Sequence, residues 1–396
     1  MPSAAVQRLG PDKSASVDLP LFDVSAELSA ELGRKLVQGA AIWGFLWIAA
    51  SPPIGPYEAS TIMNDHGNGK EAGGGGGGRT YDMDEETVNK VFDISREFFK
   101  DARREEKEAV RIKNNKGWVD MHVENLDPSK RSRGDFKQAF NLTEAQPDGG
   151  EWRQKLPQTF RRNNSEAILR DFHAQCRRLA YRILRLLAMG LGLPNDDWLV
   201  ESHEHSPFTS RLNYYPRLPP DTDYSPETDT RAGSHSDYGS ITLLFQRDQP
   251  GLEILTPQGT WASVPVFPPN YHSSTFPPVV VNIADMLSYW TNGVLKSTIH
   301  RVVVVPESGE PDDDDDAEQQ KSAGLGRDRY SIAIFIQPTR DTEIVPMPSS
   351  IVADRAVEFA GETVGHGGGS GHRTLTAGEY LDQRLQATYG AVYSKT

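Results

Sequence analysis

Short β-rich runs separated by Gly- and Pro-containing turns fill the second half of the chain, from Ser210 onward. We expect strands in seven of these runs: 210–216, 240–246, 251–255, 261–266, 278–283, 298–305 and 329–337. Many short strands at such spacing are typical of a sandwich or a barrel. This part of the chain is therefore predicted to form a β-rich domain.

The first half of the chain has a mainly helical character. Apolar residues recur at helical spacing in 26–41, 84–109 and 165–190, and a further helix is expected at 376–393. Short strands are expected at 17–24 and 43–48. The predicted organisation is an N-terminal region of helices and strands, a β-rich domain and a C-terminal tail with a helix, over 1–200, 201–345 and 346–396.

Two segments interrupt these patterns. Residues 49–80 contain three prolines and the run Gly73–Gly78, and we interpret them as a flexible surface insertion. A phosphate-binding loop is the alternative, but the Lys-Ser/Thr ending of a P-loop is missing. A translated intron would also look like this, so whether the insertion is native stays open. The stretch 306–328 contains PDDDDDAEQQ and is predicted to be a solvated acidic loop.

Composition disfavours several classes of partner. The net charge is -13, which disfavours binding to nucleic acid or to an anionic membrane surface.

The N-terminus has no secretory h-region, and the apolar run 40–50 is too short to span a bilayer. The single cysteine, Cys176, rules out an internal disulfide and is expected to be a small buried residue. A cytoplasmic location is predicted; the oligomeric state cannot be read from the sequence.

Three side chains form a candidate metal site. His235 and Asp237 are two residues apart, so in an extended chain they point to the same side. A lone His-x-Asp is weak evidence, and His300, inside a strongly β-forming run, is the natural third ligand. Two histidines and one carboxylate leave three faces of an octahedral ion open, which suits non-haem Fe(II). Zinc would more often be tetrahedral with one open position.

The last predicted strand offers a candidate anion-binding pair. Arg329, Ser331, Ala333 and Phe335 alternate onto one face of it. A guanidinium and a hydroxyl two residues apart can grip one carboxylate through charge-assisted hydrogen bonds. A surface arginine on an edge strand is the alternative, and the residues alone leave both interpretations open.

Together these segments resemble the isopenicillin N synthase-like family of Fe(II)/2-oxoglutarate oxygenases. The similar segments in the second half are Asn213-Tyr-Tyr215-Pro, His235-Ser-Asp237-Tyr-Gly-Ser-Ile-Thr, Val280-Val-Asn-Ile-Ala-Asp285, Ser297-Thr-Ile-His300-Arg-Val and Arg329-Tyr-Ser331. In the first half they are Trp43-Gly-Phe, Arg96-Glu-Phe-Phe99 and Asn115-Lys-Gly-Trp118. The resemblance implies a β-rich α+β fold with a distorted double-stranded β-helix, or jelly roll, and flanking α-helices.

The resemblance also implies a reaction. Residues 201–345 would be the catalytic domain and 1–200 its cap. Fe(II) would bind at the candidate metal site, with 2-oxoglutarate and O2 as co-substrates. Arg329 and Ser331 would bind the distal carboxylate of 2-oxoglutarate, supported by Tyr215 and Asn213, for which ordinary strand-end packing is the alternative. The expected activity is oxidation, most often hydroxylation, of a small organic metabolite, giving succinate and CO2; desaturation and ring formation stay open.

Substrate identity is less constrained. Segments 231–246 and 378–389 are most similar to fungal thymine hydroxylase-like members, whose substrate contacts would fall on Asn115, Arg211, Tyr238 and Phe335. Relatives with other substrates share these residue types, so pyrimidine oxidation is one alternative. Two other classes stay open: a non-catalytic member of the fold, and a metal-dependent hydrolase, in which Arg329 and Ser331 would have no role. A hydrolase could use His203 and His205, which we expect to be exposed.

Overall fold

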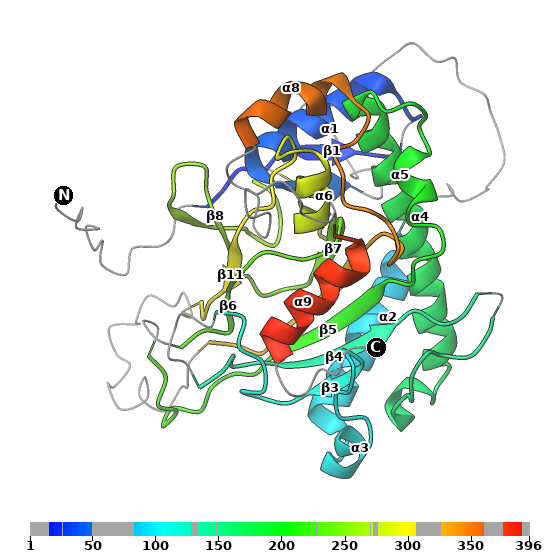
Figure 1. The fold of residues 1–396 in the computed structure, drawn as a ribbon. Coiled ribbons are helices and arrows are strands. Elements are labelled where there is room, and N and C mark those ends of the chain that lie inside the picture. Colours follow the sequence, from blue (N-terminus) through cyan, green and yellow to red (C-terminus); the bar gives the residue numbers. More distant parts are fainter. Residues whose placement is uncertain are drawn as a thin grey trace, which may run out of the picture.

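The computed structural model describes residues 16–25, 27–49, 83–127, 133–147, 149–225, 229–269, 271, 276–305, 326–359 and 375–389. All but residue 49 of the predicted insertion at 49–80, and most of the predicted acidic loop at 306–328, therefore lie outside the described residues. The remaining chain forms two β-sheets with helices around them (Figure 1).

The larger sheet joins strands from both halves of the chain. Its eight strands are, in spatial order, β1 (Leu21–Asp23), β2 (Phe45–Ala49), β10 (Val279–Ile283), β7 (Ile241–Gln246), β12 (Arg329–Ile336), β5 (Thr209–Tyr215), β4 (Gln138–Thr143) and β3 (Gly117–Val119). All neighbours are antiparallel except β1 and β2. Four of these strands precede residue 200, so the predicted cap contributes directly to the main sheet.

The smaller sheet carries the two histidines of interest. It consists of four antiparallel strands in the order β6 (Ala232–His235), β11 (His300–Val302), β8 (Leu252–Leu255) and β9 (Trp261–Ser263). His300 pairs directly with His235 across β11 and β6. The smaller sheet thus brings together residues that are far apart in the sequence.

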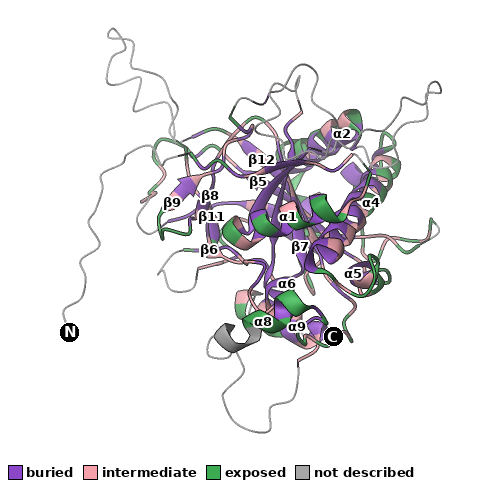
Figure 2. Ribbon diagram, turned by 90° about the horizontal axis from the view of Figure 1, so that it is seen from above, coloured by how far each residue is buried: buried purple, intermediate pink, exposed green. Residues whose placement is uncertain are grey.

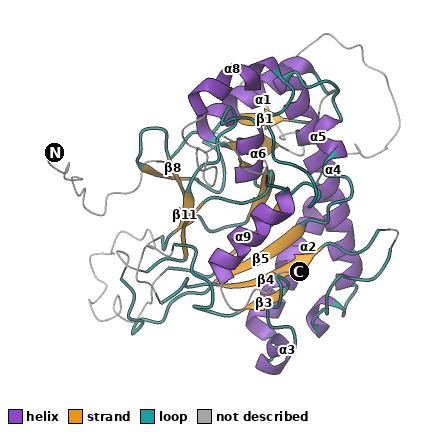
Figure 3. Cartoon of the chain, in the orientation of Figure 1, coloured by secondary structure: helices purple, strands orange, loops and turns teal. Residues whose placement is uncertain are grey.

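Helices cover both faces of the larger sheet (Figures 2 and 3). On one side lie α1 (Ala30–Trp43), α2 (Glu85–Arg96) and α4 (Ser165–Leu191), which share a large apolar core with the sheet. The helix α9 (Ala377–Tyr389) lies on the opposite side, in front of β5. Shorter elements complete the fold: η1 (Glu97–Asp101), α3 (Arg104–Glu108), η2 (Gln158–Phe160), α5 (Trp198–Glu201), α6 (Asp285–Trp290) and α8 (Ser350–Phe359).

Local sequence explains where α1 begins and ends. The Ser29 hydroxyl caps its N-terminus by accepting a hydrogen bond from the Leu32 amide, and Gly44 ends it in the left-handed conformation at φ 65°. Its packing on α4 requires glycine, because a Cβ on Gly33 would lie 2.4 Å from the Leu186 carbonyl oxygen. The backbones of these two long helices therefore cross in direct contact.

Strand β12 shows how one element serves both faces of the sheet. Ile332, Ile334 and Ile336 lie in the apolar core beneath the helices. Arg329 and Ser331 alternate with them and line a cavity on the other face. The predicted alternation along this strand is confirmed, so its polar residues face a cavity while its isoleucines stabilise the core.

Most predicted elements are present, with three corrections. All nine predicted strands occur, but β3, β4 and β6 were not predicted. The helix predicted at 84–109 is broken, because the π-helical turn η1 separates α2 from α3. His203 is not exposed: it is only 1% accessible, and its ring nitrogens bond to the Leu199 carbonyl and the Ser240 hydroxyl at 2.6 and 2.8 Å. Cys176 is buried, as predicted.

Candidate metal centre and active site

Two imidazoles and one carboxylate converge where β6 and β11 meet. His235 ends β6, His300 begins β11, and Asp237 follows β6 after one intervening residue. The Nε2 atoms of both histidines lie 3.8 Å from Asp237 Oδ1, and one ligand atom from each residue lies within 4.8 Å of the others. This is the separation expected of side chains that surround a single cation.

Hydrogen bonds fix which atoms face the centre. The Nδ1 atoms of His235 and His300 lie 2.7 and 3.1 Å from the carbonyl oxygens of Gly233 and Thr298. A proton on each Nδ1 leaves the Nε2 lone pairs directed at the common point. Asp237 Oδ2 accepts from Thr242 Oγ1 at 2.6 Å and from Asn282 Nδ2 at 2.9 Å, so Oδ1 is left for a metal. The donor set therefore fits a divalent ion with open positions.

The charge states agree with this geometry. Burial, followed by the neighbouring His300, holds the pKa of His235 well below its ordinary value. Burial acts to raise the pKa of Asp237, but the two histidines and the hydrogen bonds from Thr242 and Asn282 lower it overall. Neutral imidazole and ionised carboxylate are the forms that bind metal, so the site needs no proton rearrangement to accept an ion.

A buried guanidinium lies on the same cavity as the three candidate ligands. This cavity, of about 70 Å³, is lined by His235, Asp237 and His300 together with Arg329, Ser331, Tyr215 and Asn213. The arrangement follows from strand register, because Arg329 pairs with Tyr215 and Ser331 with Asn213 across β12 and β5. All four residues predicted to bind 2-oxoglutarate therefore face one space.

The direct hydrogen-bond partners of Arg329 among the described residues are neutral, and the Asp248 carboxylate attracts the guanidinium without forming an ion pair with it. Its nitrogens lie 3.2 Å from the Gln249 carbonyl oxygen, 3.3 Å from Gln246 Oε1 and 3.5 Å from Ser331 Oγ. The guanidinium carbon lies 4.9 Å from the centre of the Tyr215 ring, and burial lowers the pKa of the group. A buried cation without a carboxylate partner is costly, so this position is suited to an anionic ligand.

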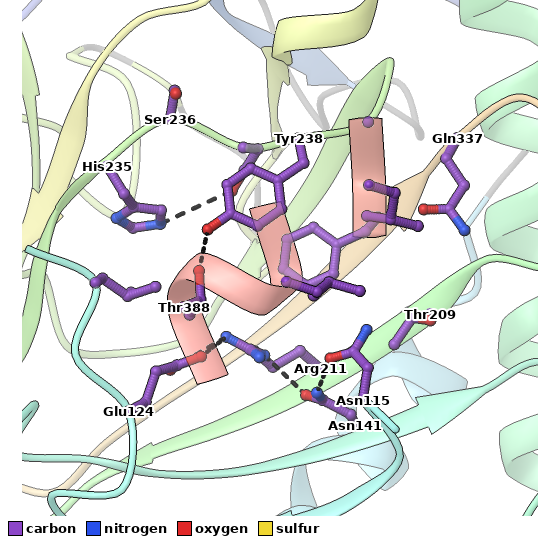
Figure 4. A pocket seen from close by; sticks show the side chains of 16 residues that line it. Asn115, Glu124, Asn141, Thr209, Arg211, His235, Ser236, Tyr238, Gln337 and Thr388 are labelled. Atoms are coloured by element: carbon purple, nitrogen blue, oxygen red, sulfur yellow. Dashed lines mark hydrogen bonds and ion pairs between the residues drawn. The ribbon is translucent and has the colours of Figure 1, made fainter. Parts of the chain in front are cut away.

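The four predicted substrate contacts line a second cavity. Asn115, Arg211, Tyr238 and Phe335 surround a space that also reaches His235 and Asp237 (Figure 4). One wall is polar: Arg211 donates to Asn141 Oδ1 at 2.8 Å and to Glu124 Oε1 at 3.0 Å. The Tyr238 hydroxyl lies 2.6 Å from Thr388 Oγ1, so α9 contributes to this cavity.

Sequence reasoning missed a buried charged cluster beside both cavities. Lys137 Nζ lies 2.6 Å from Glu124 Oε2 and 3.7 Å from Asp135 Oδ2, and all three residues are buried. Burial raises the pKa of Asp135 to about 6. Asp135 Oδ1 accepts from the Gly233 amide at 3.1 Å, and the carbonyl of that residue bonds to His235. The only sequence signal was the pair of charges, Asp135 and Lys137, in a segment where polar and apolar residues are mixed.

Comparisons with known proteins identify the class. Residues 208–338 match the 2OG-Fe(II) oxygenase superfamily. The UPF0676 protein C1494.01 of Schizosaccharomyces pombe is 31% identical, over 95% of this chain and 94% of the relative. The 2-oxoglutarate-dependent dioxygenase htyE of Aspergillus rugulosus is 27% identical, over 79% and 88%. The crystal structure of the full-length Neurospora crassa thymine hydroxylase with alpha-KG and thymine superposes with a TM-score of 0.65 at 23% identity, over 96% of this chain and 98% of that one.

The chain belongs to the 2OG-Fe(II) oxygenase superfamily. The predicted β-rich α+β fold with a jelly-roll core is confirmed. The protein is a 2-oxoglutarate-dependent dioxygenase with Fe(II) as its metal, so the predicted reaction class and cofactors are also confirmed. Within the described ranges, no helix has the length and apolarity that a bilayer span requires.

Proposed function

We propose that His235, Asp237 and His300 hold the Fe(II), and that Arg329 and Ser331 bind the distal carboxylate of 2-oxoglutarate. One observation carries this assignment: the buried guanidinium and the three candidate ligands line the same cavity. Tyr215 and Asn213 complete the co-substrate site by facing Arg329 and Ser331 across the strand pair. A metal-dependent hydrolase would leave the buried guanidinium without a role.

The side chains of the two cavities position the co-substrate and the substrate, neutralise charge and exclude water from the metal centre. Bound Fe(II), with 2-oxoglutarate and O2, supplies the oxidising power and yields succinate, CO2 and an oxidised product. Arg329 neutralises one carboxylate of the co-substrate in a place that water reaches poorly, because the residue is 4% exposed. The second cavity meets the first at His235, Asp237 and Phe335, so a substrate there would lie next to the metal.

The substrate proposed for this second cavity is a small organic metabolite, and hydroxylation is the expected outcome. Pyrimidine-base oxidation is the second candidate, supported by the convergence of Asn115, Arg211, Tyr238 and Phe335 on one cavity and by the likeness to a thymine-bound structure. Desaturation or ring formation would need the same site. We also infer a cytoplasmic protein without a nucleic-acid partner, supported by the net charge of -13 and the single buried cysteine.

The decisive assay measures succinate against substrate loss. Protein loaded anaerobically with Fe(II) is mixed with 2-oxoglutarate, O2 and a panel of metabolites that includes thymine. We expect one class of compound to raise succinate formation at least about tenfold over the rate without substrate, with one succinate per product. If no Fe(II)-loaded preparation of the wild-type protein consumed 2-oxoglutarate, a hydrolase or a non-catalytic protein would be favoured instead.

Asp285 is a further residue that we expect to position the metal ligands. Its carboxylate accepts hydrogen bonds from three hydroxyls: Ser236 at 3.1 Å, Ser297 at 2.7 Å and Tyr380 at 2.7 Å. Its amide donates to the Asp237 carbonyl at 2.9 Å. One buried side chain therefore ties both ligand-bearing segments to α9.

Replacing Asp285 with asparagine should weaken Fe(II) binding about tenfold, because the amide cannot accept from all three hydroxyls and outer partners tune metal affinity. Anaerobic titration with Fe(II) measures the affinity, and circular dichroism checks the fold. The matched control is Asp196→Asn, at an exposed position. Unchanged Fe(II) affinity in a folded Asp285→Asn protein would show that the residue has no positioning role.

A further inference from the structure

A cationic vestibule opens beside the substrate cavity. We use this name for a space of about 570 Å³ whose lining includes six basic residues: Arg111, Lys113, Lys116, Arg153, Lys155 and Arg340. No acidic residue is among the described residues that line it. In a chain with 42 basic and 55 acidic residues, six cations gathered around one space are a marked local reversal of charge.

The vestibule adjoins the substrate cavity. The two spaces share five lining residues: Asn115, Thr209, Gln337, Leu381 and Leu385. In Figure 4, Thr209 and Gln337 lie across the substrate cavity from His235. A molecule that passed these shared residues, between β5 and α9, would reach from the metal centre into the vestibule.

Several of the six cations are available to an incoming anion. Arg111 pairs with Glu108 at 2.7 Å, and Arg340 pairs with Asp382 at 2.7 Å. Lys113, Arg153 and Lys155 are exposed, and none forms an ion pair with a carboxylate of the described residues. Lys116 Nζ donates to the Arg153 carbonyl at 3.3 Å, and burial together with the nearby Arg153 guanidinium lowers its pKa. The charges of Lys116 and Arg153 are thus close together, and no carboxylate of the described residues pairs with either of them.

The vestibule is a different site from the one that binds the co-substrate. It shares no lining residue with the cavity that contains Arg329, where a buried guanidinium is already provided for 2-oxoglutarate. Clefts lined by charges of one sign concentrate oppositely charged ligands and speed their association. The group attracted here would belong to the molecule that occupies the substrate cavity.

We propose that the cationic vestibule binds an anionic group, a carboxylate or a phosphate, on the molecule that this enzyme oxidises. This inference rests on the proposed function and narrows its substrate class. The substrate is an acid long enough for its anionic end to lie among Lys113, Arg153 and Lys155 while its reacting carbon lies near His235. A free uncharged base such as thymine would leave the vestibule without a ligand.

Binding of charge-matched probes tests the proposal. The probes are small carboxylates and phosphate monoesters, aromatic and aliphatic, each with its uncharged amide or alcohol. Ligand-observed NMR measures their binding to anaerobic protein loaded with Fe(II) and saturating 2-oxoglutarate. We expect each anionic probe to bind more tightly than its uncharged counterpart. The triple variant Lys113→Gln/Arg153→Gln/Lys155→Gln should bind them about tenfold more weakly and their uncharged counterparts less than twofold differently. Added salt should weaken anion binding to the wild type.

The matched control removes the same amount of charge elsewhere. Arg34, Arg103 and Arg161 are exposed and line neither the vestibule nor the two cavities, so Arg34→Gln/Arg103→Gln/Arg161→Gln should bind the anions as the wild type does. The proposal is overturned if uncharged probes bind as well as anions, if no anion binds, or if both triple variants lose affinity equally. It is also overturned if the vestibule variant loses only 2-oxoglutarate affinity. Failure of the proposed function would look different, since wild-type protein would then form no succinate.

Discussion

Replacing His300 with alanine should reduce succinate formation by at least about 1,000-fold, because two protein ligands cannot hold Fe(II) in the geometry that three provide. The Nε2 atom of His300 lies 3.8 Å from Asp237 Oδ1 and faces the same point as His235. Anaerobic titration should show a matching loss of Fe(II) affinity. Circular dichroism should stay close to that of the wild type, since the residue lies at the start of a short strand.

His205 provides the matched control for this variant. It is exposed, and it belongs to the His-x-His pair that a hydrolase could have used. Its partner His203 is buried with both ring nitrogens hydrogen-bonded. We therefore expect His205→Ala to keep Fe(II) affinity and turnover within about twofold of the wild type. Loss of metal in His205→Ala, with retention in His300→Ala, would refute the assigned site.

Replacing Arg329 with glutamine should raise the KM for 2-oxoglutarate by about 100-fold, because the variant lacks the charge-assisted pair with the distal carboxylate. The ligand-free protein should lose little stability, since the change removes a buried cation whose direct hydrogen-bond partners among the described residues are neutral. Thermal unfolding with and without 2-oxoglutarate measures both effects. The wild type should be stabilised by the co-substrate, whereas the variant should not respond at the same concentration.

Arg247 provides the matched control, because the same Arg-to-Gln substitution can be made there at a position away from the metal centre. It pairs with Asp93 at 3.1 Å and lines none of the cavities around the metal centre. Arg247→Gln should therefore leave the KM for 2-oxoglutarate within about twofold of the wild type. An equal rise in KM for both variants would mean that the co-substrate is attracted by overall charge rather than bound at Arg329.

Strands that are apolar on at least one face could be predicted from the sequence. The isoleucines of β12 recur at every second position after Arg329 and Ser331, and the valines of β10 form a continuous apolar run, so both patterns could be recognised. The triad could be proposed because His235 and Asp237 are close in sequence and His300 lies in a β-forming run. Their actual convergence depends on the pairing of β6 with β11, which local sequence does not encode.

Other parts depend on contacts between distant segments. Strand β6 has the sequence Ala-Gly-Ser-His, which has low intrinsic strand propensity and forms a strand because β11 pairs with it. The charges at Asp135 and Lys137 obscure the strand that begins at residue 138, since buried ion pairs look like exposed polar residues in a sequence. The vestibule combines residues 111–116, 153–155 and 340, which no local pattern relates.

The two-faced character of β12 has a consequence for how this enzyme can diversify. A shift of the whole strand by one residue in its pairing with β5 and β7 would exchange its faces, placing isoleucines toward the co-substrate and a guanidinium in the apolar core. Both losses would occur in one step, without a tolerable intermediate. New substrate ranges are therefore more accessible through α9 and the segment 111–116, whose residues border the incoming molecule without holding the sheet together.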